Sequence, residues 1–162
     1  AGITLDTKNF AVKTGVRTFE AAAYLRKRGA NTLTVKGMFS DNIETYSEMD
    51  DIVCKAHVYR GCAISIAPSG DGDIRLASAQ AADEMLNLKG VEESLVLFED
   101  KKQINISARS YGNVNVQIIM EKLGGGGHQT MAATQLKNTT KELAYQHLLS
   151  EIDNTLDDEE NS

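Results

Sequence analysis

The stretch INISARSYGNVNVQIIMEKLGGGGH, from Ile104 to His128, holds the elements that decide the fold. Its first part alternates apolar and polar residues, which predicts a β-strand over residues 104–108 with Arg109 on the polar face at its end. An amphipathic helix is then predicted from the i, i+3, i+4, i+7 spacing of Val116, Ile119, Met120 and Leu123. The glycines end this helix.

Four consecutive glycines, Gly124, Gly125, Gly126 and Gly127, precede His128. A helix end needs one glycine, occasionally two, to adopt the left-handed conformation that satisfies its last carbonyls. The run therefore costs more conformational entropy than capping requires. We predict that a ligand approaches this backbone, because bare consecutive N–H groups form a concave donor surface for phosphate oxygens, with His128 as a further donor at its rim. A close-packed or flexible turn is the alternative.

Arg109 and Ser110 stand shortly before the glycine run. The turn and the helix between the two segments can bring both to one edge of a sheet. The guanidinium of Arg109 and the glycine amides would then converge on a phosphate group. A surface ion pair is the alternative role for Arg109.

The rest of the chain also alternates strand and helix patterns. Further strands are expected at residues 62–67, 95–98 and 132–136. Helices are expected at residues 19–28, 41–59 and 74–88. A last helix is expected to begin at the capping box formed by Thr139 and Glu142 and to end at about residue 152. Ile3 to Leu5 is expected to form a short strand that ends at Asp6. These elements predict an α/β fold, with a mixed β-sheet flanked by helices.

Composition limits the class of function. The chain has 162 residues, 23 of them acidic and 17 basic, and the stretch Asp157 to Glu160 is entirely acidic. The remaining body is close to neutral, which argues against long nucleic acid as the main ligand, because duplex binding needs an excess of lysine and arginine. The sequence also lacks a run of about 18 apolar residues and a signal peptide, so we expect a cytoplasmic chain without membrane contact.

Several titratable residues have simpler interpretations. Cys54 and Cys62 show neither a metal-binding nor a disulfide pattern and are expected to be reduced structural thiols. His57 and His147 are expected within helices, in structural or surface roles. The aspartates at 71 and 73 resemble the start of a calcium loop, but Ala82 replaces the required glutamate, so an ordinary turn is expected. Asp6 suits ligation of a hard cation, although spacing alone does not establish it.

Several segments, in this order, resemble DHH-family phosphoesterases. They are AGITLDT at residues 1–7, RTFE at 17–20, ISARS at 106–110 and GGGGH at 124–128, followed by the pair Ala132 and Ala133. The stretch NVQIIMEKL at residues 115–123 makes the chain most similar to the C-terminal part of the GdpP-type cyclic-di-AMP phosphodiesterases. The resemblance extends from residue 1 to about residue 153. Three residues separate His128 from Ala132 rather than two, and Thr134 replaces a usual glycine, which favours the GdpP-type subgroup.

The resemblance implies a two-lobed enzyme, in which a DHH lobe holds two divalent metals, usually manganese, and a DHH-associated lobe binds the substrate. It implies four parts: the C-terminal end of the DHH lobe (1–36), a connecting helix (37–60), the DHH-associated substrate-binding domain (61–153) and an acidic tail (154–162). Asp6 matches the last metal-binding aspartate. The substrate-binding motif corresponds to Arg109, Ser110, Gly124, Gly125, Gly126, Gly127 and His128.

The activity implied by the resemblance is the metal-dependent hydrolysis of cyclic-di-AMP to pApA. One carboxylate cannot hold two metal ions, so the chain alone is expected to be inactive, to bind manganese weakly or not at all, and to need an upstream DHH lobe in the same polypeptide. A nucleotide- or RNA-binding module without catalysis and an interaction scaffold are the alternatives. Base preference and homodimer formation stay open, and full-length relatives are expected to be membrane-anchored through upstream segments.

Overall fold

A computed structural model describes the chain except for residues 8, 12, 40–41, 69–72 and 161–162. The chain forms two units, Ala1–Asn42 and Ile43–Ser162. The four parts expected from the sequence stay a prediction. The acidic residue at position 41 that was expected to start a helix, and the one at position 71, lie outside the described residues.

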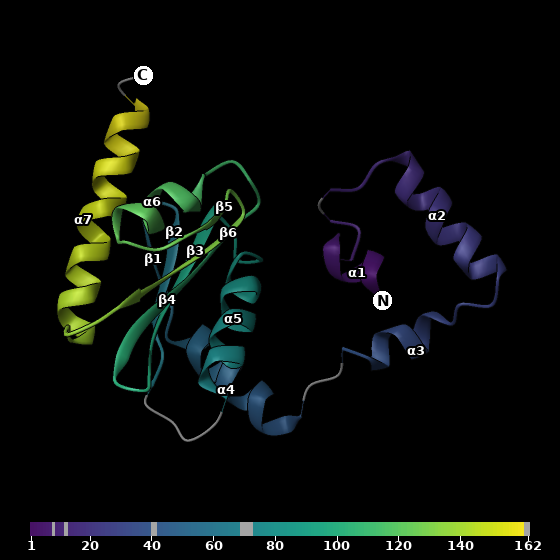
Figure 1. The fold of residues 1–162 in the computed structure, drawn as a ribbon, viewed down its shortest axis with the longest axis horizontal. Helices are drawn as coiled ribbons and strands as arrows, with labels where there is room; N and C mark the ends of the chain where they lie inside the picture. Colours follow the sequence, from purple (N-terminus) through teal and green to yellow (C-terminus); the bar gives the residue numbers. More distant parts are fainter. Residues whose placement is uncertain (8, 12, 40–41, 69–72, 161–162) are drawn as a thin grey trace. The chain divides into compact units, whose positions relative to one another are not determined.

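The first unit contains three short helices (Figure 1). These are α1 (Gly2–Asp6), α2 (Val16–Lys27) and α3 (Thr32–Gly37). The strand expected at residues 3–5 is therefore wrong. The Leu5 amide donates to the Ala1 carbonyl and the Thr7 amide to the Ile3 carbonyl, both at 3.0 Å, because a segment without a neighbouring strand satisfies its backbone groups locally.

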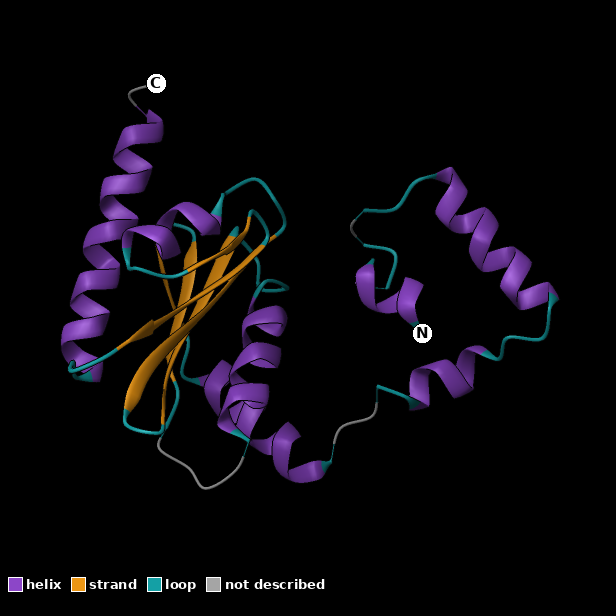
Figure 2. Cartoon of the chain, in the orientation of Figure 1, coloured by secondary structure: helices purple, strands orange, loops and turns teal. Residues whose placement is uncertain are grey.

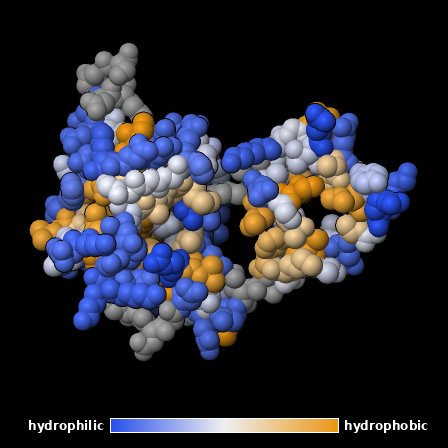
Figure 3. Space-filling view, viewed as in Figure 1, coloured by the Kyte–Doolittle hydropathy of each residue, from blue (hydrophilic) through white to orange (hydrophobic). Residues whose placement is uncertain are grey.

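Apolar side chains of the first unit are largely exposed, and they gather on its visible face (Figure 3). Among the described residues of this unit, Thr7 alone is buried. The large exposed apolar residues are Leu5, Phe10, Val16, Phe19, Tyr24, Leu25, Leu33, Met38 and Phe39. The rings of Phe10 and Phe19 stack with their centroids 5.4 Å apart. This unit thus buries very little of its apolar surface by itself.

The second unit is built on a six-stranded mixed sheet (Figure 2). The strands are β1 (His57–Tyr59), β2 (Cys62–Ile66), β3 (Glu93–Asp100), β4 (Gln103–Ser110), β5 (Gly126–His128) and β6 (Met131–Leu136), in the order β1-β2-β3-β4-β6-β5. Strands β2 and β3 are parallel, and every other neighbouring pair is antiparallel. The predicted mixed α/β fold is confirmed.

Helices cover both faces of this sheet. They are α4 (Ile43–Cys54), α5 (Ile74–Met85), α6 (Val116–Lys122) and α7 (Lys141–Glu160). Strand residues such as Leu95, Ile106 and Ala108 join one core with α6 and α7. The intervening residues, such as Ala63 and Val96, join a second core with α4 and α5. The period-2 alternation of the strands thus supplies two cores from one sheet.

Two expectations about helix ends are wrong. The helix expected to reach residue 59 ends at Cys54, and His57–Tyr59 forms strand β1, because Arg60 and Gly61 at φ +49° and +83° turn the chain back onto β2. The last helix, expected to end at about residue 152, continues to Glu160 as α7. Thr155 is buried there, and its hydroxyl donates to the Glu151 carbonyl at 2.7 Å. No helix among the described residues has the length and apolar character needed to cross a membrane.

Candidate functional site

Arg109 and His128, far apart in the sequence, lie in one row across the sheet. Arg109 on β4 pairs with Met131 on β6, and Met131 pairs with His128 on β5. Directly paired residues point to the same face of a sheet, so these three side chains share a face. Two interstrand spacings of about 4.8 Å separate the Cα atoms of Arg109 and His128 by about 10 Å. The structure therefore brings together two of the predicted site residues.

The next row on this face consists of very small residues. Ser107 on β4 pairs with Ala133 on β6, and Ala133 pairs with Gly126 on β5. Helix α5 packs on β3 and β4 of the same face, while Met131, Ala133 and His128 are exposed. We define the open face as Ser107, Arg109, Gly126, His128, Met131 and Ala133. The small side chains of this row leave room for a flat ligand to approach the strand backbones.

Arg109 is held rigidly at the border between α5 and the open face. Its Nη1 donates to the Ser107 hydroxyl at 3.1 Å and to the Ala108 carbonyl at 2.9 Å. Its Nε lies 3.4 Å from Oδ1 of Asp83 on α5. Arg109 lies on the opposite face of β4 from the core residues Ile106 and Ala108, which confirms the expected face. The residue is only 7% exposed, so its side chain is buried. The described residues supply no acceptor to Nη2, which leaves this group able to bind an anion.

Ser110 lies on the other face of β4 and has a structural role. Its hydroxyl lies within donating distance of two carbonyls, Val114 at 2.7 Å and Gln129 at 3.1 Å, and it accepts from the Gly112 amide at 3.2 Å. These bonds tie the loop after β4 to the turn between β5 and β6. The side chain of Ser110 therefore does not belong to the open face, and its role in the substrate-binding motif stays a prediction.

The first two glycines of the run cap helix α6. The Gly124 amide donates to the Glu121 carbonyl at 2.9 Å, and the Gly125 amide donates to the Met120 carbonyl at 2.8 Å. Gly124 adopts φ +77°, the left-handed conformation of a helix C-terminus. Both amides are therefore already used by the protein, and they do not form the predicted concave phosphate cradle.

Gly125 and Gly127 permit the close approach of strand β6. A Cβ atom on Gly125 would lie 2.6 Å from Thr134 Cβ, and one on Gly127 would lie 2.5 Å from the Met131 carbonyl oxygen. The close-packing alternative is thus correct for these two glycines. Gly126 differs, because nothing lies within 4 Å of a Cβ placed there.

Strand β5 is a further element that the sequence did not predict. Gly126, Gly127 and His128 form it, at the edge of the sheet beside β6. Glycine is depleted in strands, so residue preference argues against one here. An edge strand presents unpaired backbone groups along its outer side. Backbone donors near His128 are thus supplied by a strand edge rather than by a loop.

The described residues do not form a metal centre. Asp6 is exposed at the end of α1, and no group of three or more His, Cys, Asp or Glu side chains in the described part of the chain is placed to hold a metal ion. His57 lies in β1 instead of a helix, and its Nε2 is 2.8 Å from the Tyr145 hydroxyl. His147 lies in α7 as expected, with its Nε2 3.7 Å from Glu151 Oε1. Neither histidine is near a metal-binding cluster.

A buried thiol and carboxylate pair lies beneath α6 and α7. Cys62 donates to Glu93 Oε1, and both residues are almost fully buried. Burial, together with the nearby Glu93 charge, raises the pKa of the Cys62 thiol well above its ordinary value of 9.0. The thiol is therefore protonated and structural, as expected for a free cysteine, although its acidic partner was not predicted.

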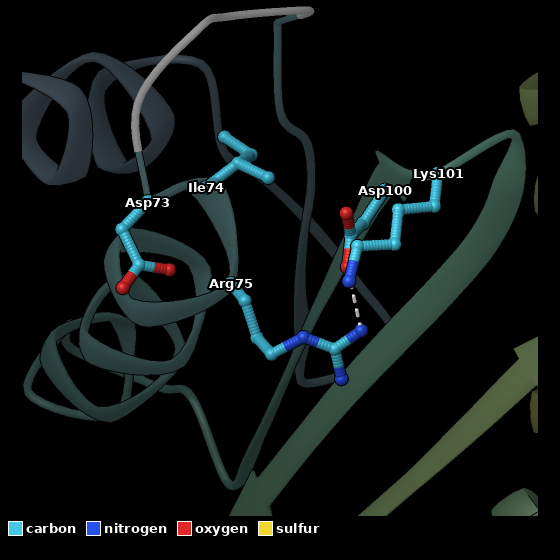
Figure 4. Close-up of a pocket in the computed structure, with 5 residues that line it drawn as sticks. All are labelled: Asp73, Ile74, Arg75, Asp100 and Lys101. Carbon is cyan, nitrogen blue, oxygen red and sulfur yellow. Dashed lines mark hydrogen bonds and ion pairs between the residues drawn. The ribbon is translucent and has the colours of Figure 1, made fainter.

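A cavity of about 410 Å³ lies at the turn of the β3–β4 hairpin, at the end away from Arg109 (Figure 4). Its lining residues are Asp73, Ile74, Arg75, Asp100 and Lys101. Arg75 Nη2 lies 2.7 Å from Asp100 Oδ2, and Asp73 caps α5 by accepting from the Leu76 amide at 3.2 Å. Asp100 pairs with Gln103 at the hairpin turn, whereas Arg109 lies near the other end of β4. This cavity is therefore separate from the open face.

The fold and the open face define an α/β sheet domain with a buried arginine and an exposed histidine on one partly uncovered face. A family model described as the DHHA1 domain matches residues 61–158, and the chain belongs to this family.

Relatives over nearly the whole chain are named cyclic-di-AMP phosphodiesterases. The chain is 46% identical over 155 residues to PdeA of Listeria monocytogenes and 42% identical over 157 residues to GdpP of Bacillus subtilis. Each match covers 94% of this chain and 24% of the relative. The chain thus spans about a quarter of the length of these relatives.

A solved structure shares the fold. An exopolyphosphatase-related protein from Bacteroides fragilis matches with a TM-score of 0.78 and 19% identity, over 91% of this chain and 47% of that protein. At this identity, the likeness shows the fold alone.

Proposed function

We propose that this chain is the substrate-binding part of a metal-dependent phosphodiesterase that hydrolyses cyclic-di-AMP to pApA. The names of the relatives from Listeria monocytogenes and Bacillus subtilis support the substrate and the reaction. The open face supports the role in binding. Nη2 of its Arg109 is available, its His128 is exposed, and Gly126, on the same strand as His128, has open space above its backbone.

The open face suits phosphate oxygens in particular. A guanidinium held by Ser107, Ala108 and Asp83 loses little conformational freedom when it binds an anion. His128, in register with it across Met131, can donate to a second oxygen. In the full-length enzyme, these groups would hold the substrate phosphates and offset their growing charge during the reaction.

The metal chemistry is proposed for the upstream DHH lobe of the full-length protein. Two manganese ions bound there would supply a nucleophile and stabilise the leaving oxygen. Asp6 is proposed as one metal ligand, but the described residues alone do not fit such a centre. We further propose that the exposed apolar residues of Ala1–Asn42 pack against that lobe, since they bury little surface within their own unit.

Amide chemical-shift titrations with cyclic-di-AMP, pApA and tRNA test the binding role. We expect the two small nucleotides to shift the amides of Gly126, Gly127 and His128. A response to tRNA alone would favour the RNA-binding alternative. Unchanged chemical shifts of these amides with every ligand would contradict the proposal.

A matched pair of variants in the full-length enzyme tests the role of His128 in activity. His128→Ala should raise KM for cyclic-di-AMP about tenfold, because a charge-assisted or neutral hydrogen bond to phosphate is lost. His147→Ala, which changes an exposed histidine on α7, is the control. Equal activity of the two variants, at unchanged thermal stability, would reject a role for His128 in the substrate site.

A further inference from the structure

The loop after β4 begins with an exposed aromatic residue, two positions after Arg109. Tyr111 follows Ser110 directly, and its hydroxyl donates to Asn87 Oδ1 at 3.0 Å. Asn87 lies just after the end of α5, where its own amide donates to the Glu84 carbonyl at 2.9 Å. The hydroxyl of Tyr111 is therefore bonded to the segment just after the helix whose Asp83 contacts Arg109, while the residue stays 43% exposed.

Arg109 contacts α5 itself, whereas Tyr111 contacts the segment that follows this helix. Asp83 contacts Arg109, and Asn87, four residues later, contacts Tyr111. Arg109 and Tyr111 are alternate residues, about 7 Å apart along an extended chain. Met131 lies in register with Arg109 on the neighbouring strand and is 47% exposed. Two exposed residues, Tyr111 two positions after Arg109 in the chain and Met131 beside it on β6, thus accompany a buried cation.

We propose that Tyr111 and Met131 form a stacking surface for a nucleobase of the nucleotide whose phosphate is bound by Arg109 and His128. This inference rests on the function proposed above and adds the residues that contact the base. Bases stack on aromatic side chains, and methionine sulfur makes favourable contacts with aromatic rings. The hydrogen bond to Asn87 already restricts the ring, so stacking costs little further conformational entropy.

A nucleobase fits this surface better than a protein partner does. The two exposed side chains belong to residues close to Arg109 in the chain and in the sheet, which matches a ligand that joins a flat ring to a phosphate. A protein partner would require a larger contiguous apolar area than two side chains. The surface is therefore assigned to a purine nucleotide, since purines offer the larger ring for stacking.

The test compares two variants of Tyr111 with a control tyrosine. Tyr111→Ala removes the ring, Tyr111→Phe keeps the ring and loses only the bond to Asn87, and Tyr46→Ala removes an exposed tyrosine on α4. Each chain is titrated with pApA and with ribose 5-phosphate, which has the sugar and phosphate but no base. Amide shifts report binding, and thermal melting reports folding.

We expect Tyr111→Ala to weaken pApA binding about tenfold and to leave ribose 5-phosphate binding unchanged. Tyr111→Phe should bind pApA within about threefold of the original chain, and Tyr46→Ala should match it. Unchanged pApA binding by Tyr111→Ala, or an equal loss for both ligands, would overturn the stacking surface while the phosphate site stands. Failure of the original chain to bind either ligand would overturn the proposed function together with this inference.

Discussion

Single alanine substitutions at Gly125, Gly126 and Gly127 should have different effects, although the three glycines are neighbours. Gly126→Ala adds a methyl group into open space, with a backbone that alanine can adopt. We expect its free energy of unfolding to stay within about 1 kcal/mol of the original, since such a change restricts mainly the unfolded chain. Its folded structure should be preserved.

Gly125→Ala and Gly127→Ala should both damage the fold. The new methyl group would lie 2.6 Å from Thr134 Cβ in the first variant and 2.5 Å from the Met131 carbonyl oxygen in the second. Gly127 also has φ +155°, which disfavours other residues. Forcing β5 and β6 apart should cost about 3 kcal/mol, the upper part of the range for overpacking, and lower the melting temperature by about 10 °C.

Gly126→Ala should differ from the original chain in its binding of pApA, although its stability should be normal. The methyl group would project from β5 on the open face. It would lie next to Ala133 of β6, at the outer edge of the sheet. We expect pApA binding to weaken about tenfold, equivalent to about 1.4 kcal/mol. Amide-shift titration and thermal melting of all three variants measure both effects.

Two results would refute this reasoning. If Gly126→Ala melted as low as Gly125→Ala, the three glycines would not occupy the described environments in β5. If Gly126→Ala kept its stability and bound pApA as well as the original chain, the open face would not be the nucleotide-binding surface.

Three further predictions concern charge, pH and metal. Asp83→Asn should tighten the binding of inorganic phosphate about threefold at low salt, because the Asp83 carboxylate, 3.4 Å from Arg109 Nε, offsets the charge of the guanidinium. The gain in affinity should shrink with added salt, and weaker binding at low salt would contradict this prediction. The raised pKa of Cys62 means that the folded chain keeps a proton that the unfolded chain loses above the ordinary value of 9.0, so stability should fall as pH rises. Cys62→Ser should make that decline shallower by up to about 1.4 kcal/mol per pH unit in chemical denaturation at alkaline pH, and identical slopes would rule the mechanism out. The purified chain with added manganese should not hydrolyse cyclic-di-AMP above a mock preparation, whereas measurable turnover would show that the upstream lobe is dispensable.

Elements with a strong local pattern could be predicted from the sequence. The strands at Cys62–Ile66 and Gln103–Ser110 and the helices at Ile74–Met85 and Val116–Lys122 follow from the spacing of their apolar residues, since each buries one side against the core. Arg109 was also placed correctly on the polar face of β4, because side chains alternate along any strand. The matched family agrees with the resemblance carried by the motif residues.

The tertiary structure decided which groups each residue meets. Four identical glycines differ in role because Gly124 and Gly125 donate to carbonyls of α6, Gly125 and Gly127 face the backbone of β6, and Gly126 faces open space. Helix α5 likewise buries Arg109 beside Asp83, and β6 turns Gly126–His128 into a strand. The sequence by itself determined the alternation of strands and helices and the residues that identify the family. Which glycine caps, which packs and which stays open depended on backbones brought close only by folding, because steric contacts and hydrogen-bond partners come from other elements of the fold.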